Sequence, residues 1–355
     1  MIDVPTTNST RCLYLNSGAT VIRDSWISDC HAVGFDSQAI LGCNGPGPYL
    51  IENNDLQGAT ENVMFGGCDP VSSDLIPSDI TMRRNYIHKQ ESWKGTWSIK
   101  NLFELKNARR VLLEGNVMEH SWVASQVGMA IVIKSSTETS AACTWEGTKD
   151  VTVRSNLFRY SHRGLNIQAI DGSSAGTTAS HTERITVVNN IFSDVGTSNG
   201  IAPSDGWLML LPHDLKDIRI EHNTFIGNAD GYGLAGYFTY SGGAARRIDI
   251  TNNVYAGRSY YALASDGGNH QGALTTFAGT SWRFAGNAVS QVDQQFWGLY
   301  PSGNSYTDRV SSLGLAADGS LGSGSPFRGR ATDGTDPGAN VAEVLRQTQG
   351  VKVAQ

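Results

Sequence analysis

Two segments of the sequence place charged residues in an alternating apolar pattern: LFELKN (102–107) and AIVIKS (130–135). Such alternation is typical of a β-strand, in which every second side chain points to the same side. If the apolar residues face inward, Glu104, Lys106 and Lys134 face outward. Paired lysines can hold a carboxylate, or remove a proton from carbon when a neighbouring positive charge lowers the pKa of one of them.

A third segment, LNIQAI (165–170), has the same pattern and places Asn166 and Gln168 outward. We therefore expect Lys106, Lys134 and Gln168 to stack in that order on neighbouring strands. Repulsion between two ammonium groups one strand apart should depress one pKa, and a carboxylate two residues away should oppose that effect. The alternative is a solvated charge ladder that contributes little, as most surface ion pairs do.

Two loops carry aromatic and basic residues suited to a saccharide: HKQESWKGTWSIK (88–100) and EHSWVASQ (119–126). Tryptophan rings stack on sugar rings, and polar groups beside them grip hydroxyls or carboxylates. We expect both loops to wall one groove, although each tryptophan could equally pack as a lid over the flank of the fold. The candidate binding residues are His88, Trp93, Lys94, Trp97, His120 and Trp122, together with Asn166 and Gln168.

Long acidic loops over 67–79, 136–150 and 171–184 are the only candidates for a metal site. They contain enough carboxylates to bind Ca²⁺, which takes six to eight oxygen ligands. Their spacing specifies no ligand set, so Ca²⁺ binding by these loops competes with the alternative that the carboxylates are purely structural, and no other cofactor is indicated. Cys43 and Cys68 occupy matching positions of neighbouring repeats, where they are either a disulfide or two stacked thiols.

The elements that position these residues are defined by an eight-residue repeat with Asn at its sixth position in eight of nine copies. Apolar residues stand five and three places before that position and two places after it. The spacing predicts a strand, a corner with a left-handed asparagine, and a second strand in each copy. The copies are TVIRDSWI (20–27), YLIENNDL (49–56), ITMRRNYI (80–87), VLLEGNVM (111–118), VTVRSNLF (151–158), ITVVNNIF (185–192), IRIEHNTF (218–225), IDITNNVY (248–255) and WRFAGNAV (282–289).

Repeats about 30 to 40 residues apart fit one coil of three short strands with loops. Stacked coils would align the asparagines, whose amides could bond along the column, while the apolar columns fill the interior. We therefore expect an all-β, single-stranded right-handed parallel β-helix of nine or more coils over residues 1–300. Residues 301–355 are expected to form a closing segment packed on it.

The V-x-I-x-x-N-x-F signature, which spans about 270 of the 355 residues, resembles the right-handed parallel β-helix repeat family that includes the pectate lyases. GPGPYLIENNDL (45–56) and SPFRGRATDGTDPGANV (325–341) are also similar to segments of largely uncharacterised bacterial secreted β-helix proteins. The resemblance implies an extracellular or periplasmic protein that acts on carbohydrate. Because repeats begin almost at once without an apolar signal, we expect the N-terminus to be truncated.

IVIKSS (131–136) resembles the lysine-bearing strand of alginate lyases and chondroitinase B, in which lysine is the base and an arginine on the next coil assists. Here the next strand has Gln168 instead, and Arg163 is the candidate substitute. The resemblance implies a polysaccharide lyase that cleaves a uronate-containing polysaccharide by β-elimination, with Lys106, Lys134, Glu104 and Arg163 as catalytic candidates.

Two other functions compete with the lyase. A glycoside hydrolase would need two carboxylates facing one cleft, such as Glu104 with Glu61 or Glu119. A non-catalytic glycan-binding or structural solenoid would use the tryptophan loops alone. The net charge of −6 without a basic run excludes nucleic acid as a partner, and no apolar stretch is long enough to span a membrane. We expect a monomer with a polysaccharide or oligosaccharide as its partner.

Overall fold

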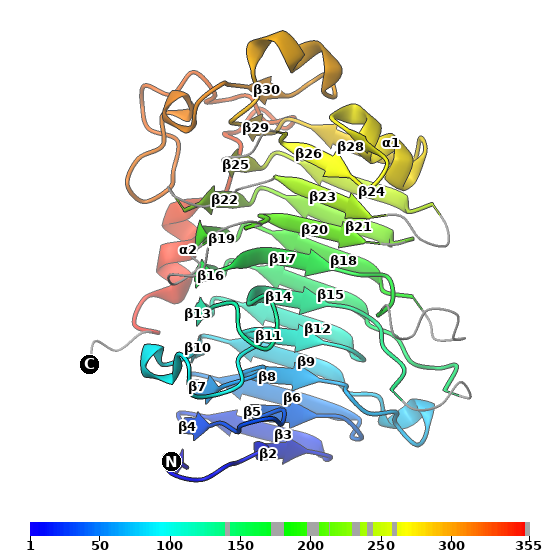
Figure 1. Cartoon of the computed structure of the whole chain (residues 1–355), viewed down its shortest axis with the longest axis vertical. Coiled ribbons are helices and arrows are strands. Elements are labelled where there is room, and N and C mark those ends of the chain that lie inside the picture. The colour runs from blue at the N-terminus through cyan, green and yellow to red at the C-terminus, as the bar shows by residue number, and fades with distance from the viewer. Residues whose placement is uncertain are drawn as a thin grey trace.

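The computed structural model describes residues 1–138, 143–171, 181–196, 206–212, 214–228, 235–239, 244–257 and 261–351. The chain forms a parallel β-solenoid in which three sheets run along the length of the molecule (Figure 1). Each coil contributes one strand to each sheet, and every strand pairs in parallel with its counterparts on the coils before and after, apart from one short antiparallel pair near the C-terminal end. The expected all-β parallel solenoid is confirmed.

Sheet C contains the first strand of each repeat copy, and all nine copies are present. The register is the one that the repeat predicts, because residues five and three places before the asparagine face one another on successive coils. Its strands are β3 (Gly18–Arg23), β6 (Gly47–Glu52), β9 (Ser78–Arg83), β12 (Arg109–Glu114), β15 (Lys149–Arg154), β18 (Glu183–Val188), β21 (Lys216–Glu221), β24 (Arg246–Thr251) and β28 (Trp282–Ala285).

Sheet A contains the second strand of each copy, reached from sheet C through the tight corner. It has eleven strands because a short strand precedes the first copy and another follows the last. Its strands are β1 (Ile2–Asp3), β4 (Trp26–Cys30), β7 (Asp55–Gly58), β10 (Tyr86–His88), β13 (Val117–Ser121), β16 (Leu157–Ser161), β19 (Ile191–Val195), β22 (Thr224–Gly227), β25 (Val254–Ala256), β29 (Ala288–Val289) and β30 (Ser305–Tyr306).

Sheet B carries the charged segments and is joined to its neighbours by longer loops. Its strands are β2 (Arg11–Leu15), β5 (Gln38–Gly42), β8 (Val63–Phe65), β11 (Phe103–Leu105), β14 (Met129–Ile133), β17 (Arg163–Ile167), β20 (Met209–Pro212), β23 (Gly236–Thr239), β26 (Leu263–Ser265) and β27 (Gly268–Asn269).

The asparagines at the corner form a continuous ladder of side-chain hydrogen bonds. In each step the Nδ2 group of one asparagine donates to the Oδ1 atom of the asparagine on the next coil, at 2.9 to 3.1 Å. That oxygen also accepts the backbone N–H of the first asparagine. The ladder comprises Asn54, Asn85, Asn116, Asn156, Asn190, Asn223, Asn253, Asn287 and Asn304.

The left-handed residue of each corner is the one before the ladder asparagine, so the expectation that the asparagine itself is left-handed is wrong. These residues have φ between 50° and 68°. The ladder asparagine must instead aim its amide along the stack, while its neighbour turns the chain. The left-handed column comprises Asp24, Asn53, Arg84, Gly115, Ser155, Asn189, His222, Asn252 and Gly286.

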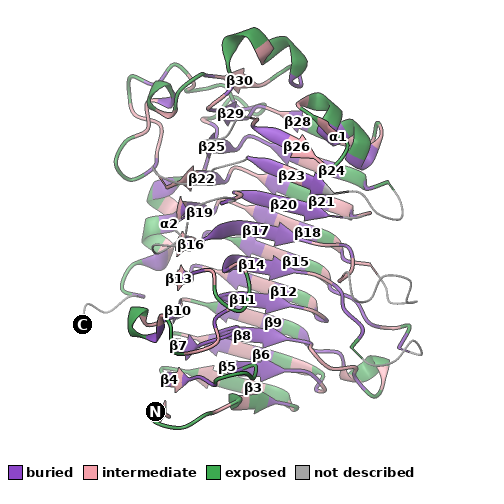
Figure 2. Cartoon of the chain, viewed as in Figure 1, coloured by how far each residue is buried: buried purple, intermediate pink, exposed green. Residues whose placement is uncertain are grey.

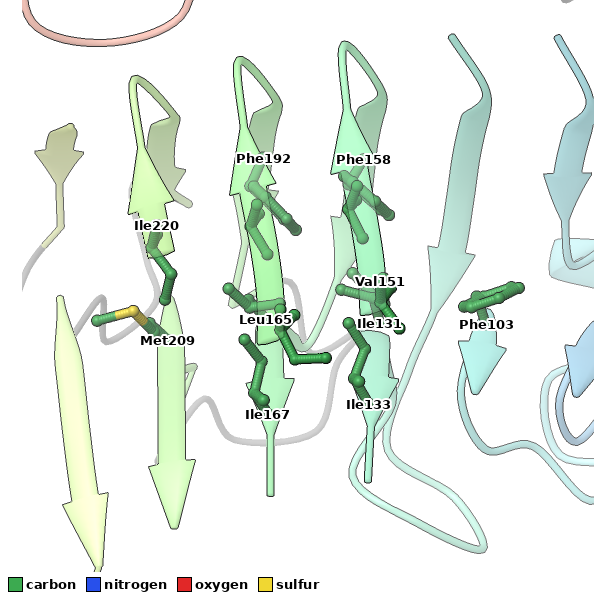
Figure 3. Close-up of a cluster of buried hydrophobic side chains, with 14 of the residues drawn as sticks. Phe103, Ile131, Ile133, Val151, Phe158, Leu165, Ile167, Phe192, Met209 and Ile220 are labelled. Atoms are coloured by element: carbon green, nitrogen blue, oxygen red, sulfur yellow. The ribbon is translucent and has the colours of Figure 1, made fainter. Parts of the chain in front are cut away.

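The interior is filled by the apolar columns that the repeat predicts (Figure 3). Two places after the ladder asparagine, four aromatic rings stack in sequence: Phe158, Phe192, Phe225 and Tyr255, with centroids 4.3, 4.7 and 5.1 Å apart. Burial runs along the strands of the middle coils, whereas β3 at the N-terminal end is largely exposed (Figure 2). The core is therefore one continuous column.

The C-terminal segment returns along the outside of sheet A. Helix α2 (Val341–Thr348) lies beside β16 and β19 in Figure 1, and Val341 and Val344 pack on Ile191. The other helices are α1 (Gln271–Ala278) and the short 3₁₀ turns η1 (Ser73–Leu75), η2 (Glu91–Trp93), η4 (Gln294–Leu299) and η5 (Val310–Leu313). Among the described residues, no helix is both long and apolar enough to cross a membrane.

Two disulfides join neighbouring coils near the N-terminal end. Cys43 and Cys68 are bonded, with α-carbons 6.0 Å apart, so the disulfide alternative is the one the structure contains. Cys12 and Cys30 also form a disulfide, with α-carbons 5.9 Å apart, which was not predicted from the sequence. Cys143 is a buried free thiol.

Replacing a ladder asparagine in the middle of the stack should destabilise the fold strongly. Asn156→Ala removes donors to Asn190 Oδ1 and Leu113 O and leaves the Asn116 amide without its acceptor. At about 1 kcal/mol for each lost bond, we expect the free energy of unfolding to fall by roughly 3 kcal/mol in urea denaturation. The half-buried end of the ladder is the matched control: Asn304→Ala removes bonds to Asn287 and Phe284, but water can reach these groups and replace the bonds, so the loss should be only about 1 kcal/mol. Equal losses at the two positions would contradict this account.

Candidate functional site

The strand register brings the predicted charged residues into order on the outer face of sheet B. Glu104, Val132 and Asn166 are direct partners on β11, β14 and β17. Immediately after these strands, the backbone N–H of Lys134 donates to Leu105 O, and that of Gln168 donates to Ile133 O. The expected order of Lys106, Lys134 and Gln168 on successive coils is therefore present in the structure.

Lys134 is the centre of an ion cluster. Its Nζ atom lies 3.0 Å from Glu104 Oε1 and 2.7 Å from Asp171 Oδ2. Burial alone would lower the pKa of Lys134, but the two carboxylates outweigh it and raise that pKa above its ordinary value. The expected depression of one lysine pKa by the other lysine is not found at Lys134, because the loop after β17 supplies a second carboxylate. Lys134 is an ammonium ion at neutral pH.

Lys106 lies beside this cluster but pairs with a different residue. Its Nζ atom is 3.1 Å from Glu138 Oε1, in the loop after β14. Ser136 Oγ also donates to that glutamate, at 3.1 Å. Each lysine of the column thus has its own loop carboxylate, and Lys106 is not among the residues that line the cleft described next.

A cleft of about 340 Å³ opens on sheet B around Lys134. Its floor is apolar where Val132 and Leu210 face outward, and its rim is rich in amide and charged groups. Neutral amides with a few charges suit a ligand with many hydroxyl groups. The polar lining residues are Asn101, Gln126, Lys134, Arg163, Asn166, Gln168 and Asp171.

Glu104 lies beneath the cleft and holds its wall in place. It is 1% exposed, and its Oε2 atom accepts a hydrogen bond from Asn101 Nδ2 at 2.8 Å. The same amide group donates to Gln126 Oε1, while Asn101 Oδ1 accepts the backbone N–H of Met129. Glu104 thus positions both Lys134 and Asn101 without reaching the open surface.

Arg163 and two aromatic rings continue the cleft toward the C-terminal coils. The Arg163 guanidinium lies over the Trp207 ring, 4.0 Å from its centroid, and Trp207 stacks on Tyr237 at 4.4 Å. Both rings are half-buried and stand on the outward face of sheet B. The sequence interpretation missed these rings, because strict alternation along WLMLLP (207–212) would place Trp207 on the inward face together with Met209 and Leu211, which are buried in the core.

The tryptophans of the two predicted binding loops are mostly packed inside. Trp93 and Trp122 are each 3% exposed and pack with Ile99, so the expectation that they form an exposed sugar platform is wrong. Trp97 is half-buried and stacks on His31, with ring centroids 3.7 Å apart. These rings cover the corner between sheets A and B, because the long loops there need an apolar core of their own.

His88, Lys94 and His120 lie outside the cleft lining. His88 Nε2 is 3.0 Å from Asp55 on sheet A, and His120 stacks on Tyr160 of the same sheet. Lys94 pairs with Glu91 at 3.0 Å. The two loops therefore divide their residues between two faces, and the one at 119–126 contributes Gln126 to the cleft.

A buried lysine of the 88–100 segment, which was not among the candidate site residues, secures the loop after β10. Lys89 is 1% exposed, and its Nζ atom donates to Gly58 O, Thr60 O and Asn101 O at 2.9 Å and to Asn62 Oδ1 at 2.6 Å. These acceptors come from two separate segments, 58–62 and the residue Asn101 that precedes β11. Lys89 therefore ties the neighbouring coils together next to Asn101, at the edge of the cleft.

The carboxylate pairs that a hydrolase would need are only partly brought together. Glu119 belongs to sheet A, where Tyr86 and Arg159 bond it, so it does not face Glu104. Glu61 is buried on sheet B, and burial followed by the nearby Glu104 carboxylate raises its pKa. Asp171 is the second carboxylate on the cleft, since it shares Lys134 with Glu104.

The acidic loops bring three residues together on the edge of sheet B. Asp69, Cys143 and Glu146 have ligand atoms within 4.8 Å of one another. Asp74 is exposed in η1. Of the loop at 171–184, residues 172–180 lie outside the described part of the chain, so the calcium expectation for that loop stays a prediction.

Comparison of the chain with protein-family models, curated proteins and solved structures finds no match. The fold is therefore established by the strand pairing itself. The likeness to pectate-lyase-type proteins stays a resemblance of sequence motifs, and any function has to be argued from the cleft.

Lys89→Met should destabilise the protein severely while keeping the volume of the side chain. The change removes a buried donor from four oxygen atoms, of which Thr60 O keeps the backbone N–H of Lys100, and the unsatisfied acceptors should cost roughly 3 kcal/mol. Lys94→Met in the same loop removes a half-exposed ammonium and should change stability by less than about 0.5 kcal/mol. Thermal and urea unfolding of both variants measure the difference. A loss at Lys89 as small as that at Lys94 would refute the tying role.

Proposed function

We propose that the cleft on sheet B binds an acidic, uronate-containing polysaccharide and that the protein is a polysaccharide lyase acting by β-elimination. The observation that carries the proposal is the Lys134 ion cluster, which sets an ammonium ion between two carboxylates in an amide-rich cleft. A ligand carboxylate can replace one of the two partners of Lys134. Binding of the ligand carboxylate to Lys134 would thus free the Asp171 carboxylate to act as a base.

The reaction divides among the cleft residues as follows. Lys134 and Arg163, as cations, bind the uronate carboxylate and stabilise the negative charge that develops when the adjacent carbon loses its proton. Binding of the uronate displaces the Asp171 carboxylate from the ammonium ion of Lys134. Loss of this cationic partner raises the pKa of Asp171 and makes Asp171 a stronger base. Asp171 takes the proton, a carbon–carbon double bond forms, and the glycosidic oxygen leaves with a proton from solvent. Lys134 acts here as a charge clamp.

A retaining glycoside hydrolase is the second candidate, because one specific observation favours it. Glu104 and Asp171 both contact the same Nζ atom, at 3.0 and 2.7 Å. Their oxygens are therefore less than about 6 Å apart, near the separation of roughly 5–5.5 Å used by retaining enzymes. The burial of Glu104 argues against this role, because a nucleophile or acid must reach the sugar. A glycan-binding solenoid without turnover is the third outcome.

We also propose an extracellular or periplasmic location. Its support is the pair of disulfides Cys12–Cys30 and Cys43–Cys68, since such bonds persist mainly in oxidising compartments. This location suits a protein that meets polymeric carbohydrate.

A substrate screen separates the three functions. The protein is incubated with alginate, pectate, glycosaminoglycans and neutral glycans, and both unsaturated products and new reducing ends are measured. A lyase gives both signals on an acidic glycan. A hydrolase gives reducing ends alone, and a binding protein gives retention in affinity electrophoresis without either product.

Lys134→Gln should abolish lyase activity while keeping a hydrogen-bond donor for Glu104. Loss of the clamp charge is expected to lower kcat/KM by at least about 100-fold. The matched control is Lys149→Gln, which removes another partly buried lysine, paired with Glu183 at 3.1 Å on sheet C. It should leave the activity unchanged. Full activity of Lys134→Gln on an acidic glycan would rule out the proposed clamp.

Trp207→Ala should weaken glycan binding by roughly 5- to 10-fold, because the ring offers a stacking surface worth about 1 kcal/mol or more. Trp26→Ala is the control, since Trp26 is an exposed ring on sheet A, far from the cleft in the strand order. Titration calorimetry with an oligosaccharide of the preferred glycan gives both affinities. Equal weakening by the two changes would place the binding surface elsewhere.

A further inference from the structure

Two loops at the edge of sheet B meet around three side chains that all carry metal-ligand atoms. Asp69 follows β8, while Cys143 and Glu146 lie in the loop between β14 and β15. One carboxylate oxygen of each acid and the thiol sulfur lie within 4.8 Å of one another. The cluster is separate from the cleft lining, and the proposed function does not use it.

Glu146 is the residue that points to a ligand, because its carboxylate is buried without a hydrogen-bond partner in the part of the chain that the structure describes. Its side chain is fully buried, and neither carboxylate oxygen makes a hydrogen bond of normal geometry to the described residues. A buried carboxylate without such bonds is costly unless a cation or a proton compensates it. The backbone that follows Glu146 is anchored, because Gly147 N–H donates to Asn107 Oδ1 and Thr148 N–H donates to Ser135 Oγ.

The other two ligands are oriented as well. Asp69 Oδ1 accepts the backbone N–H of Glu138 at 2.7 Å, which fixes the plane of that carboxylate. The Cys143 thiol donates a hydrogen bond to Pro70 O, with the sulfur and oxygen 3.7 Å apart, which orients the sulfur. Cys12, Cys30, Cys43 and Cys68 are all in disulfides, so Cys143 is the only thiol in this set of five.

We propose that Asp69, Cys143 and Glu146 bind a single divalent cation of the zinc class. One thiolate with two carboxylates suits Zn²⁺, whereas Ca²⁺ and Mg²⁺ prefer oxygen ligands alone. Donor atoms around a tetrahedral zinc ion are roughly 3.5 Å apart, so the loops need to close only slightly. The cation would fasten the loop after β8 to the loop after β14.

The electrostatics of the cluster agree with a missing positive charge. Burial, with a contribution from the Asp69 carboxylate, raises the pKa of Glu146 to about 8, although the nearby Thr137 hydroxyl opposes the shift. Burial likewise raises the pKa of the Cys143 thiol to about 11. A divalent cation would reverse both shifts, since it favours the charged forms of its ligands. The competing explanation is a proton shared between the two carboxylates.

Cobalt substitution tests the site on the full chain and does not depend on any enzymatic activity. After chelation and dialysis, Co²⁺ is added and the near-ultraviolet absorption of a thiolate–cobalt bond is recorded, followed by displacement with Zn²⁺. We expect one equivalent of Co²⁺, a thiolate band, and its loss on addition of Zn²⁺. Absence of that band, or stabilisation by Ca²⁺ alone, would overturn the proposal in favour of a shared proton or a hard-cation site.

Variants assign the ligands. Cys143→Ser should remove the thiolate band, and Asp69→Asn should weaken Zn²⁺ binding by more than about 100-fold while keeping the acceptor for Glu138. Glu146→Gln, which preserves volume in the buried position, should do the same. Asp74→Asn changes an exposed carboxylate in the same loop as Asp69 and should leave the affinity unchanged. A thiolate band that survives in Cys143→Ser, or equal weakening by Asp74→Asn, would disprove this ligand set.

Discussion

The amide ladder at the corner between sheets C and A is the interaction on which the rest of the molecule depends. Each ladder oxygen accepts two hydrogen bonds from the preceding coil, one from a side chain and one from the backbone. A slip of one residue would break both bonds and would turn every apolar side chain of that strand to the wrong face. The ladder therefore fixes which coil residues meet, and the columns on all three sheets follow from it.

Stacking in register has an electrostatic consequence, because each charge lies one coil from its counterpart. Like charges stacked one coil apart would repel one another. At the start of the sheet C strands opposite charges alternate along the column instead, because Asp79 pairs with Arg110 and Asp150 pairs with Arg184. On sheet B two lysines follow one another, and the compensation comes from loops instead. The carboxylates of Asp171 and Glu138 enter from outside the coil and pair with Lys134 and Lys106, and the carboxylates around Lys134 raise the pKa of that lysine.

This difference explains what the sequence could and could not predict. The period of the repeat gives the three strands, the ladder and the order of Lys106, Lys134 and Gln168, because stacking leaves one way to align the copies. It gives no position for a loop side chain such as Asp171, so it could not predict that the pKa of Lys134 is raised. The exposure of Trp93 and Trp122 was predicted wrongly for a related reason. A loop too long to lie flat on a sheet forms an apolar core of its own, and both rings are buried in that core. The cluster of Asp69, Cys143 and Glu146 could not be predicted either, because it forms where two loops contact each other.

The positions of the unusual residues follow the length of the coils. Successive ladder asparagines are 31 residues apart up to Asn116, then 40 residues separate Asn116 from Asn156 and 34 separate Asn156 from Asn190. A coil of about 30 residues is enough for three strands and their corners, so the excess is loop. The 40-residue coil contains Lys134, Cys143 and Glu146, and the next contains Arg163 and Asp171. Many residues of the two proposed sites therefore lie in coils that exceed this structural minimum, whereas Asp69, Asn101 and Glu104 come from the 31-residue coils.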